Sequence, residues 1–302
     1  MNRSTPAASS LGKPQPFRDW SHGQPLAEAL ARAESEVRAK PQASETRWLL
    51  FELLCVLGHW ERALKQLQHW AALKRDHDSS AHVMRSLIRA EHQRTEVLNG
   101  RASPATLGAS GRETPAWVAG LGDALKLAAN GDAAAVDAAD RTREAALAQA
   151  PDVPGASNLQ ASFDWITDSD SRIGPVCELI VAGVYRWLPF TDLKAIRKPA
   201  PGRLLDLVWA QVELQLCDGT PLSAYMPMRY PARAGDRDAL LLARETVWSD
   251  VGRTGVVARG QKMWTTDSGD MALLDLRDAT FQQATAPAGD ADEKADAGKA
   301  GP

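Results

Sequence analysis

The chain has 302 residues, of which 44% are hydrophobic and 24% are charged, with a formal net charge of −3 and a pI of about 6.1. This length is enough for about two globular domains. The charge balance provides no general basic field for nucleic acid or an anionic membrane, and no apolar run is long enough to span a bilayer. We therefore predict neither nucleic-acid binding nor membrane insertion.

Cysteine usage and the N-terminal sequence predict the compartment. The N-terminus lacks the apolar core of a secretory signal peptide. Cys55, Cys177 and Cys217 are odd in number, widely spaced and set in apolar stretches, which is typical of buried free thiols in a reducing environment. We expect a cytoplasmic protein. Residues 1–20 and 283–302 are dominated by small and polar residues, and both are predicted to be disordered tails.

Four helical patterns follow one another in the first half of the chain. Apolar residues at helical spacing begin at Leu26 and stop before Pro41, where a helix must end. Further patterns cover residues 44–57, 60–70 and about 79–98. Gly58 separates the second from the third, and Asn99-Gly100 closes the fourth, as glycine commonly does at helix ends.

Part of this helical pattern repeats. Similar segments begin at Gly23 and Gly58, and a looser third copy begins at Gly131, so the spacing resembles the tetratricopeptide period of about 34 residues. In the best match a glycine tightens the turn, Trp60 packs between paired helices and Ala63 allows their close approach. An ordinary helical bundle with glycine turns is the alternative. Either way, residues 21–157 are predicted to form TPR-like stacked helical hairpins, interrupted by a loop at 101–115.

The periodicity changes after a Pro- and Gly-rich segment at 151–160, which we predict to be a domain boundary. Residues 176–181 are apolar and β-branched, and residues 204–216 alternate between apolar and polar. Asp218-Gly219 then predicts a hairpin turn, with a return strand at 221–226. Further strands are expected at 240–248 and 271–276, and a short helix at 191–197. Residues 158–282 are therefore predicted to form a β-rich α+β domain of five to seven strands, which makes the whole chain α+β.

The densest polar cluster spans residues 165–175 and is followed by Glu178. A calcium loop is excluded, because Arg172 and Ile173 occupy positions that need an oxygen ligand and a glycine. Asp168 and Asp170 have the spacing of a phosphatase nucleophile loop, but Arg172 replaces the expected Thr, so a metal-assisted hydrolase is kept only as an alternative. The favoured interpretation is a turn in which Arg172 pairs with an aspartate through its guanidinium fork.

Other catalytic signals are weak. All six histidines lie in the first half, which excludes a Ser-His-Asp or Cys-His site within the second. Near-matches to dinucleotide and phosphate loops lack a required Gly or Lys. We therefore predict no catalytic residues, no metal and no cofactor. Trp165, Trp187, Trp209, Trp248 and Trp264 recur beside the predicted strands, and some of them could border a binding groove because Trp is enriched at interaction hot spots.

An ordered series of motifs runs through the chain. The second half contains Phe163–Pro175 with Glu178, Gly183–Phe190, Asp206–Trp209, Pro227–Pro231, Ala243–Trp248, and Gly260-Gln261 with Thr266-Asp267. The first half adds Arg47–Ala63 and Ala90-Glu91 with Arg94. In number and order, these motifs resemble the ImpE/TagJ family over about residues 22–280. Lys262 stands where the family pattern would have Arg after Gly-Gln, which keeps the charge.

The resemblance implies a non-enzymatic accessory protein of the bacterial type VI secretion system, associated with virulence. It also implies that the protein binds the small subunit of the contractile sheath through that subunit's N-terminal helix, and other sheath or recycling components are further possible partners. A general TPR-type scaffold is an alternative. We expect the partner site in the second half, where polar and aromatic motifs are dense, and the candidate residues are Trp165, Asp168, Asp170, Arg172, Tyr185, Trp187, Arg229, Tyr230, Arg244 and Trp248.

Overall fold

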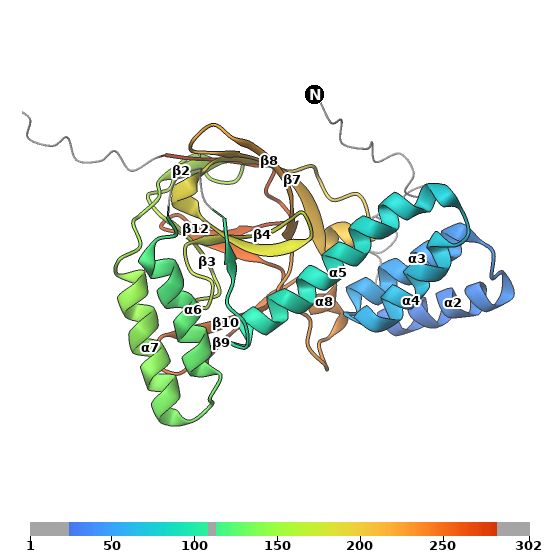
Figure 1. Cartoon of the computed structure of the whole chain (residues 1–302), viewed down its shortest axis with the longest axis horizontal. Coiled ribbons are helices and arrows are strands. Elements are labelled where there is room, and N and C mark those ends of the chain that lie inside the picture. Colours follow the sequence, from blue (N-terminus) through green and yellow to red (C-terminus); the bar gives the residue numbers. More distant parts are fainter. Residues whose placement is uncertain (1–23, 108–112, 283–302) are drawn as a thin grey trace, which may run out of the picture.

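The computed structural model describes residues 24–107 and 113–282. The predicted tails at 1–20 and 283–302 lie outside the described residues. Helices fill the first half of the chain and strands the second, which confirms the α+β class (Figure 1). No helix in the described ranges is both long enough and apolar enough to cross a membrane.

The four predicted helices are present. They are α2 (Leu26–Ala39), α3 (Ser44–Val56), α4 (Trp60–Ala71) and α5 (Asp78–Leu98), with a 3₁₀ turn at Arg75–His77 before α5. Pro25 precedes the first turn of α2 and Asn99 follows the last turn of α5. Gly58 adopts φ +70° between α3 and α4, a conformation that glycine reaches without strain, so the two helices fold back as a hairpin.

The third copy of the repeat, which begins at Gly131, forms α7 (Ala133–Leu147), and the Asp132 side chain accepts a hydrogen bond from the Ala135 amide to cap this helix. Helix α6 (Ala116–Ala128) precedes that copy and pairs with α7 as a hairpin. This hairpin lies away from α2–α4, and the long helix α5 runs between the two groups (Figure 1). The three copies therefore do not stack into one continuous array. The expectation of stacked hairpins holds locally, within α2–α4 and within α6–α7.

The largest sheet has eight strands in the order β1-β5-β4-β8-β7-β6-β13-β2. Its neighbours are antiparallel except β1 and β5, which are parallel. The predicted hairpin at Asp218-Gly219 joins β7 to β8. The strands are β1 (Ala105–Thr106), β2 (Gly155–Ser157), β4 (Val176–Val181), β5 (Val184–Pro189), β6 (Leu193–Arg197), β7 (Trp209–Leu216), β8 (Pro221–Pro227) and β13 (Asp278–Phe281).

Two smaller sheets complete the second half. One contains β12 (Gly269–Ala272), β11 (Met263–Thr266) and β3 (Ile166–Asp168), and the other pairs β10 (Gly255–Gly260) with β9 (Thr246–Val251). From residue 158 onward the described chain contains eleven strands, β3 to β13, so the prediction of five to seven was too low. Most of the extra strands are short and carry too few residues to show a clear alternation.

Three local predictions were wrong. Residues 271–276 are not one strand, because β12 ends at Ala272 and a turn follows it. Residues 191–197 were predicted to be a helix, but they form the end of a 3₁₀ turn (Phe190–Asp192) and strand β6. The strand pattern was not recognised because a bulge between Leu193 and Ala195 interrupts the alternation of buried and exposed residues. Residues 240–248 are not one strand. The short helix α8 (Asp238–Leu241) ends there, and Ala243 has φ +50°, so β9 begins only at Thr246.

The two halves of the chain share one hydrophobic core. Its members include Phe51 and Leu87 from the helices together with Ile180 and Trp209 from the sheet. A second core fills the other side of the large sheet, where Leu179 and Trp264 are buried. The predicted boundary at 157/158 stays a prediction, but β1 and β2 both precede it and both pair within the large sheet.

Candidate functional site

The predicted polar cluster folds as a turn between β3 and β4. The Asp170 carboxylate accepts hydrogen bonds from Arg172 Nε (2.9 Å) and Arg172 Nη2 (2.6 Å), and from the backbone amides of Arg172 and Ala258 (both 3.0 Å). This confirms the interpretation of the segment as a turn held by an arginine–aspartate pair. Gly174 follows at φ +67°, with Leu121 and Leu147 packed against it. The turn is thus pinned both to β10 and to the α6–α7 hairpin.

Asp168 ends β3 and points into the protein interior. Its Oδ1 accepts hydrogen bonds from the Tyr230 hydroxyl (2.8 Å) and the Asp170 amide (2.9 Å), and its Oδ2 forms an ion pair with Lys262. Lys262 is fully buried and also pairs with Glu178 on β4. One ammonium group therefore bridges two carboxylates that come from different sheets.

Glu178 connects the sheet to helix α5. Arg94 on α5 donates two parallel hydrogen bonds to it, from Nε (2.8 Å) and Nη2 (2.9 Å). The Tyr185 hydroxyl also donates to Glu178, and it accepts a hydrogen bond from Trp187 Nε1 (2.6 Å). Bidentate guanidinium–carboxylate pairs are geometrically specific. This contact therefore fixes the position and the register of α5 on the sheet.

Arg94 and Arg229 extend the network toward α3 and β7. Arg94 Nη1 donates to the Arg229 carbonyl (3.0 Å) and lies 3.5 Å from Glu91, which in turn accepts from Trp209 Nε1 (2.9 Å). The Arg229 guanidinium donates to backbone carbonyls at Val56 (2.6 Å) and Cys55 (3.0 Å), the last turn of α3. It therefore satisfies carbonyl groups that a helix end leaves without intrahelical partners.

Burial shifts the pKa of several of these groups. Burial raises the pKa of Asp168 to about 6, and the Glu178 charge adds to this rise while Lys262 opposes it. Burial would also raise the pKa of Glu178, but the charges of Arg94 and Lys262 hold it well below its usual range. Burial lowers the pKa of Arg229 to about 10. The network thus keeps Glu178 charged between two cations.

The charges within this cluster balance. Four cations face four anions, and all but the partly exposed Arg172 are buried: Arg94, Arg172, Arg229, Lys262, Glu91, Asp168, Asp170 and Glu178. Buried charges are tolerated when they are paired and hydrogen-bonded. In the described ranges, no three His, Cys, Asp or Glu side chains are grouped so that they could hold a metal ion. The geometry fits a structural network that joins the helices to the sheets.

Six of the ten predicted partner-binding residues lie inside the protein. They are Asp168, Asp170, Tyr185, Trp187, Arg229 and Tyr230, each at most 3% exposed. A side chain without accessible surface cannot contact a partner in this conformation, so direct contact by these six is not supported. Trp165 is half-buried, Arg172 is partly exposed, and Arg244 and Trp248 are exposed. For these four, a role in partner binding stays a prediction.

Sequence reasoning did not single out Glu91, Arg94 and Lys262 as members of one site. Glu91 and Arg94 occur beside Leu87, Ile88 and Ala90 on the buried side of α5. Charged residues within the apolar stripe of an amphipathic helix are a signal of buried pairing, because an unpaired charge there would be costly. The sequence therefore indicates that Arg94 is buried and paired, but it does not indicate that the pairing carboxylate is Glu178, 84 positions away.

The exposed candidates gather near the β9–β10 hairpin. Trp248 on β9 is 42% exposed, and its Nε1 donates to Ser169 Oγ (3.0 Å) in the turn that carries Arg172. The hairpin tip is held on α7, where Arg253 pairs with Glu144 through two hydrogen bonds (2.6 and 2.8 Å). A large aromatic side chain is therefore presented to solvent on a hairpin that is fixed at both ends.

Comparison with known proteins identifies a family, a relative and a solved structure that resemble this chain. Residues 160–280 match the model of the family described as ImpE protein. The chain is 39% identical over 259 residues to a Pseudomonas aeruginosa protein named "Type VI secretion system accessory component TagJ", which covers 85% of this chain and 88% of the relative. A crystal structure of a Vibrio parahaemolyticus protein shares the fold, with a TM-score of 0.76 and 24% identity over 88% of this chain and 97% of that one. The identity to the Pseudomonas protein spans both the helical half and the sheets, and the chain belongs to the ImpE/TagJ family.

Proposed function

We propose that this protein is a non-enzymatic accessory component of a type VI secretion system that works in the cytoplasm and binds the N-terminal helix of the small sheath subunit. The observation that carries the proposal is the 39% identity to the Pseudomonas accessory component over most of both chains. Because that match includes both halves, it extends well beyond the segment covered by the family model. Other sheath or recycling components are further candidate partners.

The structure supports the binding role by offering a rigid surface. Trp248 combines an exposed aromatic body with an indole N–H that is already hydrogen-bonded, so its orientation is set before a partner arrives. Aromatic side chains of this kind are enriched among residues that dominate binding energy. A preformed contact also reduces the entropy lost on association. Trp248 is therefore our first choice for a contact with the helix.

The hydrolase alternative receives no support from the carboxylates that suggested it. Asp168 is engaged by Lys262, Tyr230 and a backbone amide, and the Asp170 oxygens accept four hydrogen bonds. A nucleophile must reach its substrate, and neither of these groups has accessible surface. The general scaffold alternative is weakened because α5 separates α6–α7 from α2–α4, so the helices of the described residues do not form one continuous stack of repeats (Figure 1).

Co-purification of the intact chain with the small sheath subunit of the same bacterium tests the proposal. We expect the full-length subunit to be retained and a version that lacks its N-terminal helix to be lost. Retention of both forms would mean that a different part of the subunit is recognised. Loss of both would remove this partner. The intact chain must be used, because the shared core means that deletion of residues 1–157 would expose apolar surface and cause non-specific association.

A further inference from the structure

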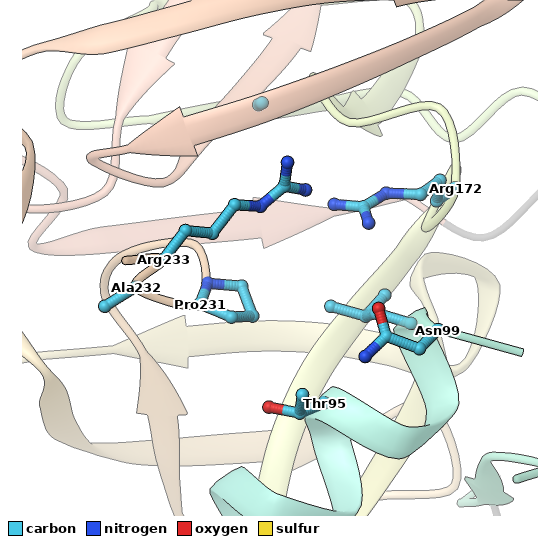
Figure 2. Close-up of a pocket in the computed structure, with 8 residues that line it drawn as sticks. Thr95, Asn99, Arg172, Pro231, Ala232 and Arg233 are labelled. Carbon is cyan, nitrogen blue, oxygen red and sulfur yellow. The ribbon is translucent and has the colours of Figure 1, made fainter. Parts of the chain in front are cut away.

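A pocket lies where the C-terminal end of α5 meets the turn that carries Arg172 and the loop after β8. Its volume is about 250 Å³, and its lining includes Arg172 and Arg233. Figure 2 shows the two guanidinium groups extending toward each other across the pocket, near Thr95 and Asn99 of α5. Leu98, Pro231, Ala232 and Ala258 supply apolar lining. The pocket thus combines an apolar wall with two cationic groups.

The charge of Arg233 is not balanced within the described ranges. Arg172 is held by Asp170, and Arg259 pairs with Asp236, but the Arg233 guanidinium forms no ion pair with any residue in 24–107 or 113–282. Burial lowers its pKa, and the charges of Arg172 and Arg259 lower it further. Three guanidinium groups therefore share two carboxylates, and the exposed Arg233 carries the remaining positive charge at the edge of the pocket lining.

Arg172 is oriented to assist an incoming anion. Its Nε and Nη2 are occupied by Asp170, and that carboxylate is itself fixed by the Ala258 amide. The guanidinium end of Arg172, which lines the pocket, extends toward Arg233 (Figure 2). An anion between Arg172 and Arg233 would replace the repulsion of the two like charges with charge-assisted hydrogen bonds. Pairs of guanidinium groups that converge in this way are suited to carboxylates.

We propose that the pocket receives the carboxylate of an acidic side chain on the bound partner, with Arg233 as the main contact and Arg172 beside it. This rests on the proposed function in one respect, since it takes the partner to be a protein. A volume of about 250 Å³ is ample for a single acidic side chain. The apolar lining suits the methylene stem of such a side chain.

The position of Trp248 supports a protein partner. Trp248 on β9 is paired with Ala258 on β10, and residues paired across antiparallel strands project to the same face of the sheet. Ala258 lines the pocket, so the exposed indole lies on the pocket side of the hairpin. A partner whose acidic side chain enters the pocket would therefore meet the aromatic surface of Trp248 next to it.

The first part of the test examines the pocket without any partner. Glutarate is titrated into the wild-type chain and the variants Arg233→Ala and Arg197→Ala, and the arginine side-chain N–H signals are followed by NMR. Arg197 is an exposed arginine on β6 and matches the charge change. We expect a saturable response in the wild type and in Arg197→Ala, and none in Arg233→Ala. Arg233→Ala should also unfold at the same or a higher temperature, since a repulsive charge is removed.

The second part identifies the source of the carboxylate. A synthetic N-terminal helix of the small sheath subunit is titrated by calorimetry into the same three proteins, with its acidic residues replaced one at a time by the corresponding amides. The Arg233→Ala variant should weaken binding at least about tenfold, as expected for a lost charged hydrogen bond. For one amide-substituted peptide, the Arg233→Ala change should have no further effect.

The outcomes separate the two proposals. If the peptide binds the wild type and Arg233→Ala equally, the proposed function stands and the carboxylate pocket for a partner side chain is refuted. If glutarate binds but the peptide does not bind even the wild type, the proposed function fails and the pocket is a site for a small free anion. If neither binds, both proposals fail.

Discussion

Replacement of Glu178 by Gln should cause a large loss of stability. Gln has nearly the same shape but no charge, and it would place an amide N–H₂ group against Arg94 and Lys262, which would then be two buried cations with fewer anions. Removal of one member of a buried ion pair costs about 3–5 kcal/mol. Because whole domains are stable by only about 5–15 kcal/mol, this change should remove a substantial fraction of the free energy of unfolding.

Urea denaturation followed by tryptophan fluorescence and far-ultraviolet circular dichroism measures this loss. With a slope of about 3 kcal/mol per molar urea, the midpoint should fall by about 1 M or more. Glu245→Gln is the control, since Glu245 pairs with the exposed Arg237 and should leave the midpoint nearly unchanged. Both signals should shift together, because Glu178 joins the helices to the sheet. An unchanged midpoint for Glu178→Gln would refute the structural role of the network.

Three further predictions concern pH, backbone conformation and binding. Since the pKa of Asp168 is raised to about 6 in the folded protein, the folded state binds more protons there than the unfolded state, and stability should increase as pH falls from 7 to 5. Below pH 5 the trend should reverse, because the pKa of Glu178 is lowered in the folded protein and the unfolded state therefore takes up a proton there first. Asp168→Asn should abolish the increase between pH 7 and 5 in thermal denaturation scans. Gly260→Ala should lower the free energy of unfolding by more than about 1 kcal/mol in urea denaturation, because at φ +89° the new Cβ would lie 2.1 Å from a backbone carbonyl oxygen. Gly219→Ala is the control, since Gly219 has a similar φ of +87° but open space around it and should lose less stability. Equal losses in the two variants would contradict this steric argument. Trp248→Ala should lower the unfolding temperature only modestly, through loss of the hydrogen bond to Ser169, but should weaken calorimetric binding of the sheath-subunit helix by roughly 2 kcal/mol. An unaltered affinity would exclude this side chain from the interface.

Local patterns predicted the helices and the main hairpin well. The apolar spacing from Leu26 and the glycine at Gly58 are set by residues close in sequence, so α2, α3 and α4 follow from periodicity and capping alone. The β7–β8 hairpin follows from strict alternation and an Asp-Gly turn. Strand β6 was missed because its bulge breaks the period of two.

The site was harder to predict because its contacts are long-range. Tyr185 and Trp187 look like surface recognition residues in a strand, but α5 covers the face of the sheet to which they point, so both are buried. The contact between Arg94 and Glu178 spans 84 positions, and no local pattern records which carboxylate a buried arginine will meet. The pocket with Arg233 likewise depends on four segments that come together only in the fold.

Calorimetric titration of the synthetic N-terminal helix of the small sheath subunit into the intact chain, repeated at several temperatures, tests the central claim most directly. We predict saturable binding at micromolar concentrations with a negative change in heat capacity, the mark of apolar surface buried on association. The absence of heat at high micromolar peptide, at every temperature, would contradict the proposed role in binding the sheath.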